Sequence, residues 1–204
     1  MQYARSSDTI VELQSFPTVK KLYFLFVLPL STIFVYGQEG LPLEQQLLLA
    51  RYDMEWTAPE SPYRVNKRPY NAFQEFDFGL YLRKEKVEIR YLFIPFEDDS
   101  KRELIPHLRA PRMAMHLASN DEDSHIAAHE IDPTVLDSVY QADWGQVFYF
   151  PPKKGFSEAK GCQMMALYRE GIGMCFVFLL FEEAPPSLPD LAELLRFLPR
   201  RLQN

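Results

Sequence analysis

Two histidines four residues apart are the sharpest candidates for metal chemistry in this sequence. His125 and His129 enclose only small and apolar residues, and acidic residues lie on both sides of them, at Asp121, Asp123 and Glu130. On a helix, residues four apart share a face, so both imidazoles would reach one zinc ion and a carboxylate would complete the site. On a strand the two side chains also share a face, but they lie farther apart.

The pair lacks the residue that a zinc protease would need for catalysis. In those enzymes a general-base glutamate stands between the two histidines, and here that space holds isoleucine and alanine. The alternative is that His125 and His129 are surface residues beside an acidic turn, and we favour it. We therefore predict neither a metal nor any other cofactor.

Signatures of nucleophilic catalysis are missing from the sequence. There is no Gly-x-Ser-x-Gly motif and no glycine-rich phosphate loop. Cys162 and Cys175 lie in apolar segments, where burial disfavours the reactive thiolate. A non-catalytic protein is therefore favoured. The alternative is a small exported hydrolase or a metal-binding enzyme whose site is assembled from residues far apart in the sequence.

The two cysteines are predicted to remain unpaired. They lie in two apolar segments joined by a turn at 170–173. Antiparallel pairing about this turn places Cys162 opposite a residue near Leu179, and Cys175 opposite Ala166 or Tyr168. Because bridged cysteines need α-carbons within about 7 Å of each other, this register predicts two buried free thiols.

A proline-rich segment at 52–73 combines aromatic and cationic residues, which is typical of recognition loops. Such a loop suits a partner protein, a glycan or an anionic ligand. The alternative is that its aromatic residues pack onto the sheet as a satellite of the core. The candidate binding residues are Trp56, Arg64, Lys67, Arg68 and Tyr70.

The N-terminal region has the pattern of an export signal. Lys20 and Lys21 precede a short apolar run at 22–36, and Gly37 ends a small-residue cleavage pattern. We therefore expect a signal peptide at 19–37, cleaved near Gly37, and a mature protein in the periplasm or outside the cell. An uncleaved anchor or a buried core segment is the alternative. Residues 1–18 are either a misassigned start or an extended n-region.

Composition predicts a single acidic globular domain at 38–204. The chain has 204 residues and a net charge of −6, and its hydrophobic content of 47% is sufficient to build a core. This charge argues against non-specific binding to nucleic acid or to an anionic membrane. After signal cleavage we expect no stable membrane span, and we expect the partner to be another protein or an envelope glycan.

The apolar patterning predicts an alternation of helices and antiparallel hairpins. Helices are expected at 41–51, at 111–117, from Asp132 onwards and, as an amphipathic C-terminal helix, at 190–198. Strands are expected at 76–82, 87–94, 144–150, 161–169 and 173–181. Because several strands are apolar on both sides, we predict an α+β fold, an antiparallel β-sheet with helices on both faces (an α/β/α sandwich).

This order of elements resembles the Mog1/PsbP-like fold group. The resemblance lies in the strand entry at 142–145, the hairpin at 160–181 and the final helix. It implies an accessory or binding protein rather than an enzyme, as an analogy at the level of the fold. Together these patterns predict an exported, non-catalytic binding or accessory protein.

The predicted cleavage can be tested on the exported protein itself. N-terminal sequencing is expected to begin at Gln38, because the small residues at Val35 and Gly37 lie where signal peptidase selects its site. A mature chain that begins upstream of Gln38 would contradict this prediction.

Overall fold

A computed structural model describes residues 40–66, 71–96, 105–122 and 124–200 of the chain. These residues belong to one compact unit, Tyr36–Asn204. The predicted signal peptide and the segment before it lie outside the described residues, so this structure does not bear on them.

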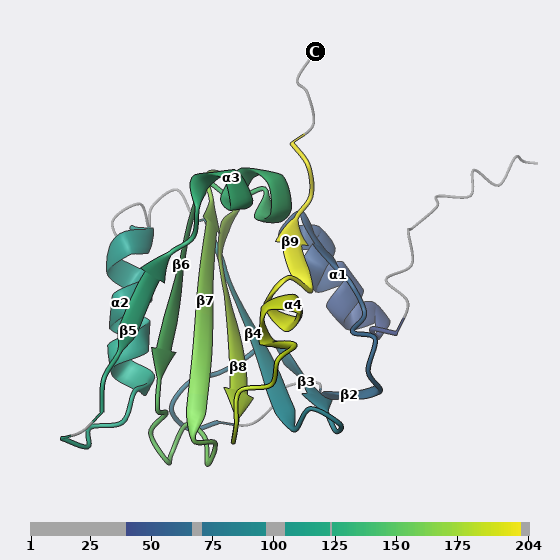
Figure 1. The fold of residues 1–204 in the computed structure, drawn as a ribbon. Helices are drawn as coiled ribbons and strands as arrows, with labels where there is room; N and C mark the ends of the chain where they lie inside the picture. Colours follow the sequence, from purple (N-terminus) through teal and green to yellow (C-terminus); the bar gives the residue numbers. More distant parts are fainter. Residues whose placement is uncertain (1–39, 67–70, 97–104, 123, 201–204) are drawn as a thin grey trace, which may run out of the picture. The chain divides into compact units, whose positions relative to one another are not determined.

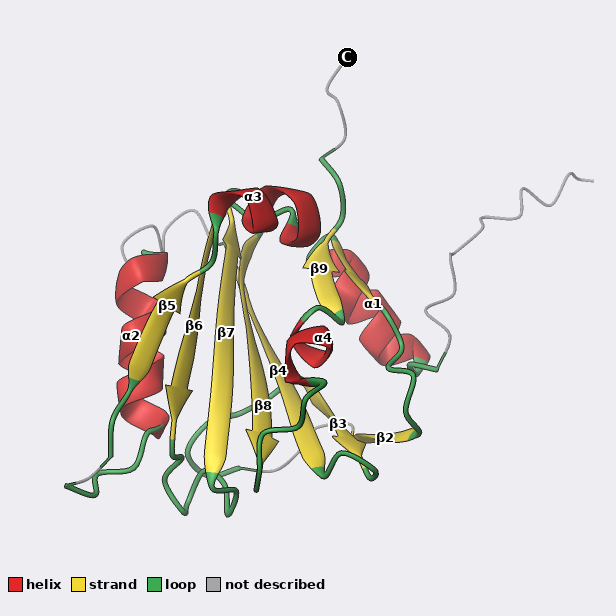
Figure 2. Ribbon diagram, in the orientation of Figure 1, coloured by secondary structure: helices red, strands yellow, loops and turns green. Residues whose placement is uncertain are grey.

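The described residues form a seven-stranded antiparallel sheet, as Figures 1 and 2 show. Its strand order is β2-β3-β4-β8-β7-β6-β5. The strands are β2 (Tyr63–Asn66), β3 (Phe78–Leu82), β4 (Val87–Pro95), β5 (Ala127–Glu130), β6 (Trp144–Phe150), β7 (Gly161–Arg169) and β8 (Gly173–Phe181). This sheet and its helices confirm the predicted α+β class.

A second, two-stranded sheet and several helices complete the described part of the fold. The small sheet pairs β1 (Met54–Trp56) with β9 (Leu195–Phe197). The helices are α1 (Leu43–Arg51), α2 (Pro106–Leu117), α3 (Pro133–Val135), the π-helix η2 (Leu136–Tyr140) and α4 (Leu188–Ala192). The predicted N-cap of α3 is confirmed, because Asp132 accepts a hydrogen bond from the backbone N–H of Thr134 at 2.8 Å.

The middle of the large sheet is apolar on both sides. Strand β8 is hydrogen-bonded between β4 and β7, and every residue of β8 from Gly173 to Leu180 is buried. Its side chains alternate between two separate clusters: Cys175, Val177 and Leu179 join one, and Phe176 and Phe178 the other. We call these two sides the Trp56 face and the Arg90 face, after a residue that lies on each.

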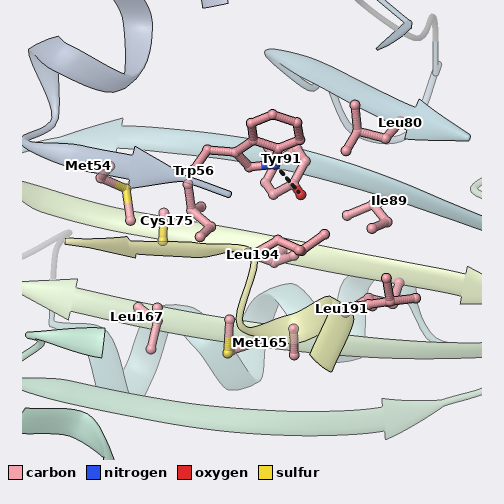
Figure 3. Packing of buried hydrophobic residues seen from close by; sticks show 14 of the residues in the cluster. Met54, Trp56, Leu80, Ile89, Tyr91, Met165, Leu167, Cys175, Leu191 and Leu194 are labelled. Atoms are coloured by element: carbon pink, nitrogen blue, oxygen red, sulfur yellow. Dashed lines mark hydrogen bonds between the residues drawn. The ribbon is translucent and has the colours of Figure 1, made fainter. Parts of the chain in front are cut away.

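A mixed layer of strands and short helices covers the Trp56 face. Residues of β1, β9, α1, α4 and η2 join the side chains of this face in one buried cluster. Figure 3 shows part of this cluster, including Trp56, whose indole Nε1 donates a hydrogen bond of 3.3 Å to the Tyr91 hydroxyl. Burial of this hydroxyl raises the pKa of Tyr91.

Helix α2 and two loop aromatics cover the Arg90 face. The helix buries Ala110, Ala114 and Leu117 on the side of β6 and β7, and small residues allow its backbone to approach the sheet. Nearer to β4, Phe76 and Phe156 pack edge-on against Phe178. The predicted start of this helix at Pro111 is wrong: the helix begins at Pro106, and Pro111 lies inside it.

The structure corrects the predicted C-terminal helix at 190–198. Helix α4 ends at Ala192, and the chain then becomes β9. Leu195 and Phe197 are buried while Arg196 is exposed, an alternation that suits a strand, and Arg196 forms an ion pair with Glu55 of β1. Pairing with β1 therefore overrides the helical spacing of the leucines. A helical layer on both faces is likewise not confirmed, since the Trp56 face carries this strand pair.

The predicted hairpins agree closely with the structure. Strands β6, β7 and β8 have the expected bounds, and the register places Cys162 opposite Leu180 and Cys175 opposite Leu167. Both cysteines are buried free thiols, as predicted. They lie on opposite faces of the sheet, which excludes a disulfide between them.

Trp56 tests how the Trp56 face is held together. It is 4% exposed, so Trp56→Ala should lower the free energy of unfolding by about 3–5 kcal/mol through lost burial and the cavity left behind. Urea unfolding measures the change. Tyr149→Ala is the control, because Tyr149 is 40% exposed and should change stability by only about 0.5 kcal/mol. Equal stabilities for the two variants would contradict the packing described here.

Candidate functional site

Four strands present one continuous row of side chains on the Arg90 face. In register, Arg64 of β2 lies opposite Tyr81 of β3, Tyr81 opposite Glu88 of β4, and Glu88 opposite Leu180 of β8. Directly opposite residues of neighbouring strands project from the same face of a sheet. The β2–β3–β4 side of this face therefore gathers polar and aromatic groups, while α2 lies over β6 and β7 at the other side.

Arg90 is the charged residue that the described part of the fold buries most deeply, at 8% exposure. Its guanidinium lies over the rings of Phe76 and Phe156, at 5.1 and 5.2 Å from the ring centroids. Its Nη1 donates a hydrogen bond of 3.0 Å to the Phe156 carbonyl. Because burying a positive charge is costly unless it is paired, this position needs a counter-charge.

Glu88 supplies that counter-charge and is oriented by it. Arg90 donates from Nε to Oε1 of Glu88 at 2.7 Å and from Nη2 to Oε2 at 3.0 Å. Such a two-point contact fixes the plane of the carboxylate. The Glu88 side chain is 30% exposed, so a carboxylate of set orientation remains open to solvent at the floor of a depression in the surface.

That depression has a volume of about 510 Å³, which lies in the size range of ligand sites. We call it the Glu88 hollow. Residues of the sheet, of the β3–β4 turn and of the 154–159 segment line it: Tyr81, Lys86, Glu88, Arg90, Lys154, Phe156, Ser157, Glu158, Ala159, Leu180, Phe181 and Glu182. Sheet residues thus form a rigid floor and the connecting segments form its walls.

The charged residues of the walls differ in whether they have an ionic partner. Glu182 lies 3.6 Å from the ammonium of Lys160. Lys86, Lys154 and Glu158 form no ion pair within the described part of the chain. The hollow therefore presents two unpaired ammonium groups and one unpaired carboxylate to any molecule that enters it.

The Glu88 hollow has no activated nucleophile among its described residues. The Ser157 hydroxyl accepts a hydrogen bond from the Ala159 N–H at 3.1 Å, and no histidine lines the hollow beside it. Cys162 lies beside the hollow on the same face of the sheet, in register with Leu180, and does not line it. Burial raises the pKa of its thiol well above the ordinary value, although the charge of Arg90 offsets part of the effect. Such a thiol is inert at neutral pH.

A second hollow, of about 600 Å³, lies between the β7–β8 turn and the end of β9. Its main charges are already engaged within the chain: Asp143 accepts hydrogen bonds from the Glu170 N–H at 2.9 Å and from Arg200. Burial acts to raise the pKa of Asp143, but these two donors outweigh it and hold the pKa below its usual range. We interpret these contacts as structural, because they hold the chain after β9 against the sheet.

The predicted metal candidates do not form a site. His129 lies in strand β5 and His125 precedes that strand, so the two histidines have the extended arrangement and not the helical one. The His129 ring packs against Tyr149, with a centroid distance of 6.0 Å. Within the described ranges no group of three or more His, Cys, Asp or Glu side chains is placed to hold a metal ion.

The described residues of the predicted recognition loop have different positions in the structure. Trp56 is a core residue, so its assignment to a binding surface is corrected, because its indole lies buried beside Tyr91. Arg64 is exposed and in register with Tyr81, next to the Glu88 hollow. Lys67, Arg68 and Tyr70 lie outside the described residues.

Sequence reasoning missed the centre of the hollow, at Tyr81, Glu88 and Arg90. The signal was present, since these residues alternate with the apolar residues of the β3–β4 hairpin and so share one face of it. That pattern alone indicates only that one side of the hairpin faces solvent. The contribution of Lys154 and Glu158, from a segment far along the chain, had no local signal.

The comparisons with known proteins give no relative from which a function could be inferred, so the proposed function is argued from the fold and the hollow. No protein-family model, curated protein or solved structure matches this chain. None of the helices in the described ranges is long and apolar enough to cross a membrane.

The Glu88–Arg90 pair predicts a specific pattern of stability changes. Glu88→Ala should lower the free energy of unfolding by about 1–3 kcal/mol, because it leaves a buried guanidinium short of two acceptors. Removing the charge as well, in Glu88→Ala with Arg90→Met, should cost less than the sum of the single changes. Glu158→Ala is the matched control and should be nearly neutral. A Glu88→Ala variant as stable as this control would show that the pair does not hold the site.

Proposed function

We propose that this protein is an exported, non-catalytic binding or accessory protein and that the Glu88 hollow is its ligand site. The observation that carries the proposal is the oriented Glu88 carboxylate, held by a buried arginine at the floor of an open, charged depression. Burying a guanidinium is costly, and a protein that needed only a core could use an apolar residue there. A preorganised polar group in a concave site suits recognition.

Catalysis has less support from the same geometry. A hydrolytic site needs a nucleophile or an activated water next to a general base. The described lining of the hollow offers a serine whose oxygen accepts a local backbone hydrogen bond, and the neighbouring thiol of Cys162 is buried outside the lining, where its raised pKa disfavours the thiolate. The alternative of a small exported hydrolase therefore remains the second hypothesis, without an observation that favours it.

The proposal also includes export from the cell and a role suggested by the resemblance of fold. The signal pattern at 19–37 supports a function in the periplasm or outside the cell. The resemblance to the Mog1/PsbP-like fold group supports an accessory role, as an analogy of fold. We propose that the partner is another protein or an envelope glycan.

Photo-crosslinking from the hollow tests the proposal. A photoreactive phenylalanine analogue in place of Tyr81 puts the probe at the rim, since the Tyr81 side chain is 41% exposed and lines the hollow. We expect a covalent adduct of defined mass when the full chain is irradiated in its own host, because a bound ligand must lie against this ring.

Tyr149 provides a matched control for that experiment. It is 40% exposed, also lies on a strand, and does not line the Glu88 hollow. The same analogue at Tyr149 should give no such adduct. Identical adducts from both positions, or none from Tyr81, would reject the hollow as the ligand site.

A further inference from the structure

We infer that the ligand of the Glu88 hollow is an acidic saccharide, a sugar chain that carries carboxylate groups. This inference rests on the proposed function and names the ligand class of the same site. Three properties of the hollow support it: an exposed aromatic ring, unpaired cations near that ring, and carboxylate acceptors, of which Glu88 is held in a set orientation beside the ring.

The aromatic ring is that of Tyr81. It is 41% exposed although it stands in a strand between β2 and β4, where neighbouring side chains usually cover a tyrosine. Its neighbour on one side is Arg64 and on the other Glu88, so the ring lies in the middle of a polar row. An exposed ring on a rigid strand offers a flat apolar platform, and the C–H face of a sugar ring can stack on such a platform.

The unpaired charges near this ring are mostly positive. Lys86 and Lys154 line the hollow, Arg64 lies beside Tyr81, and these three form no ion pair within the described part of the chain. Only Glu158 is a matching unpaired acid of the lining. The charged residues of the lining are balanced, with cations at Lys86, Arg90 and Lys154 and carboxylates at Glu88, Glu158 and Glu182, so the positive excess is confined to the groups that form no ion pair. These free cations offer ion pairs to the carboxylates of an anionic ligand.

The carboxylate acceptors distinguish an acidic sugar from a simple anion. Glu88 is held in place by Arg90 and remains 30% exposed, and Glu158 is unpaired. Carboxylates repel phosphates and other anions that have no donors, but they accept hydrogen bonds from hydroxyl groups. A ligand that combines carboxylates with many hydroxyls satisfies both kinds of group in the hollow.

The test uses oligogalacturonate as the probe and measures its binding to the full chain by titration calorimetry at low and moderate salt. Neutral dextran fragments and poly-glutamate are the two comparison ligands, one with hydroxyls alone and the other with carboxylates alone. We expect oligogalacturonate to bind more tightly than either, with an affinity that falls as salt is added.

Substitutions then connect binding to the hollow. Tyr81→Ala should weaken oligogalacturonate binding by up to about tenfold, whereas Tyr81→Phe should retain it, because the ring face makes the contact. Lys86→Gln and Lys154→Gln should each weaken it by about two- to fivefold. The controls are Tyr149→Ala and Lys84→Gln, an equally exposed tyrosine and a lysine of the same turn that does not line the hollow. Neither control should change the affinity.

Each other outcome overturns the inference. Equal binding of poly-glutamate would show a general anion site, and equal binding of dextran would show that the cations are irrelevant. Absence of oligogalacturonate binding, or a loss in the controls equal to that in Tyr81→Ala, would also reject it. The crosslinking experiment separates these failures from failure of the proposed function, since an adduct at Tyr81 of another chemical class would leave the hollow as a ligand site.

Discussion

Strand β8 sets the constraint on which the rest of this structure depends. It lies hydrogen-bonded between β4 and β7, and its side chains are apolar toward both faces of the sheet. Neither face can therefore be left to water, because exposing either row would forfeit about 1.5–3 kcal/mol for each large side chain. The layers above and below the sheet, α2 on one side and the β1–β9 pair with α4 on the other, meet this requirement.

The covering layers do not extend equally over all strands, and the Glu88 hollow lies where the cover on the Arg90 face ends. Helix α2 lies over β6 and β7, and Phe76 and Phe156 cover the centre at Phe178. Beyond them the face continues as Arg90, Glu88 and Tyr81. Arg90 is compatible with this boundary because the two phenylalanine rings cover its guanidinium while Glu88 and the Phe156 carbonyl satisfy its charge.

In the proposed function, the same arrangement joins stability to recognition. The Arg90 bond to Phe156 holds the 154–159 segment against the sheet, and that segment carries Lys154 and Glu158 into the hollow. A ligand site built in this way needs little reorganisation on binding, because the groups that orient its acceptor are part of the core.

The sequence by itself determined the hairpins β3–β4 and β7–β8 and the position of β6, because a period of two and a tight turn suffice to set a hairpin. The order of the strands across the sheet and the short strands β1, β2, β5 and β9 came only from the structure. The sequence placed β6, β7 and β8 correctly, and the predicted register kept Cys162 and Cys175 apart as free thiols. It failed for 190–198, where leucines at helical spacing became β9, and for Trp56, which was a candidate for a binding surface and is core. Both failures have one physical reason: the energy of β1–β9 pairing and of burial on the Trp56 face comes from contacts between segments far apart in the chain. Only the tertiary structure could decide them, and it alone brings Tyr81, Glu88 and Arg90 together with Lys154 in one hollow.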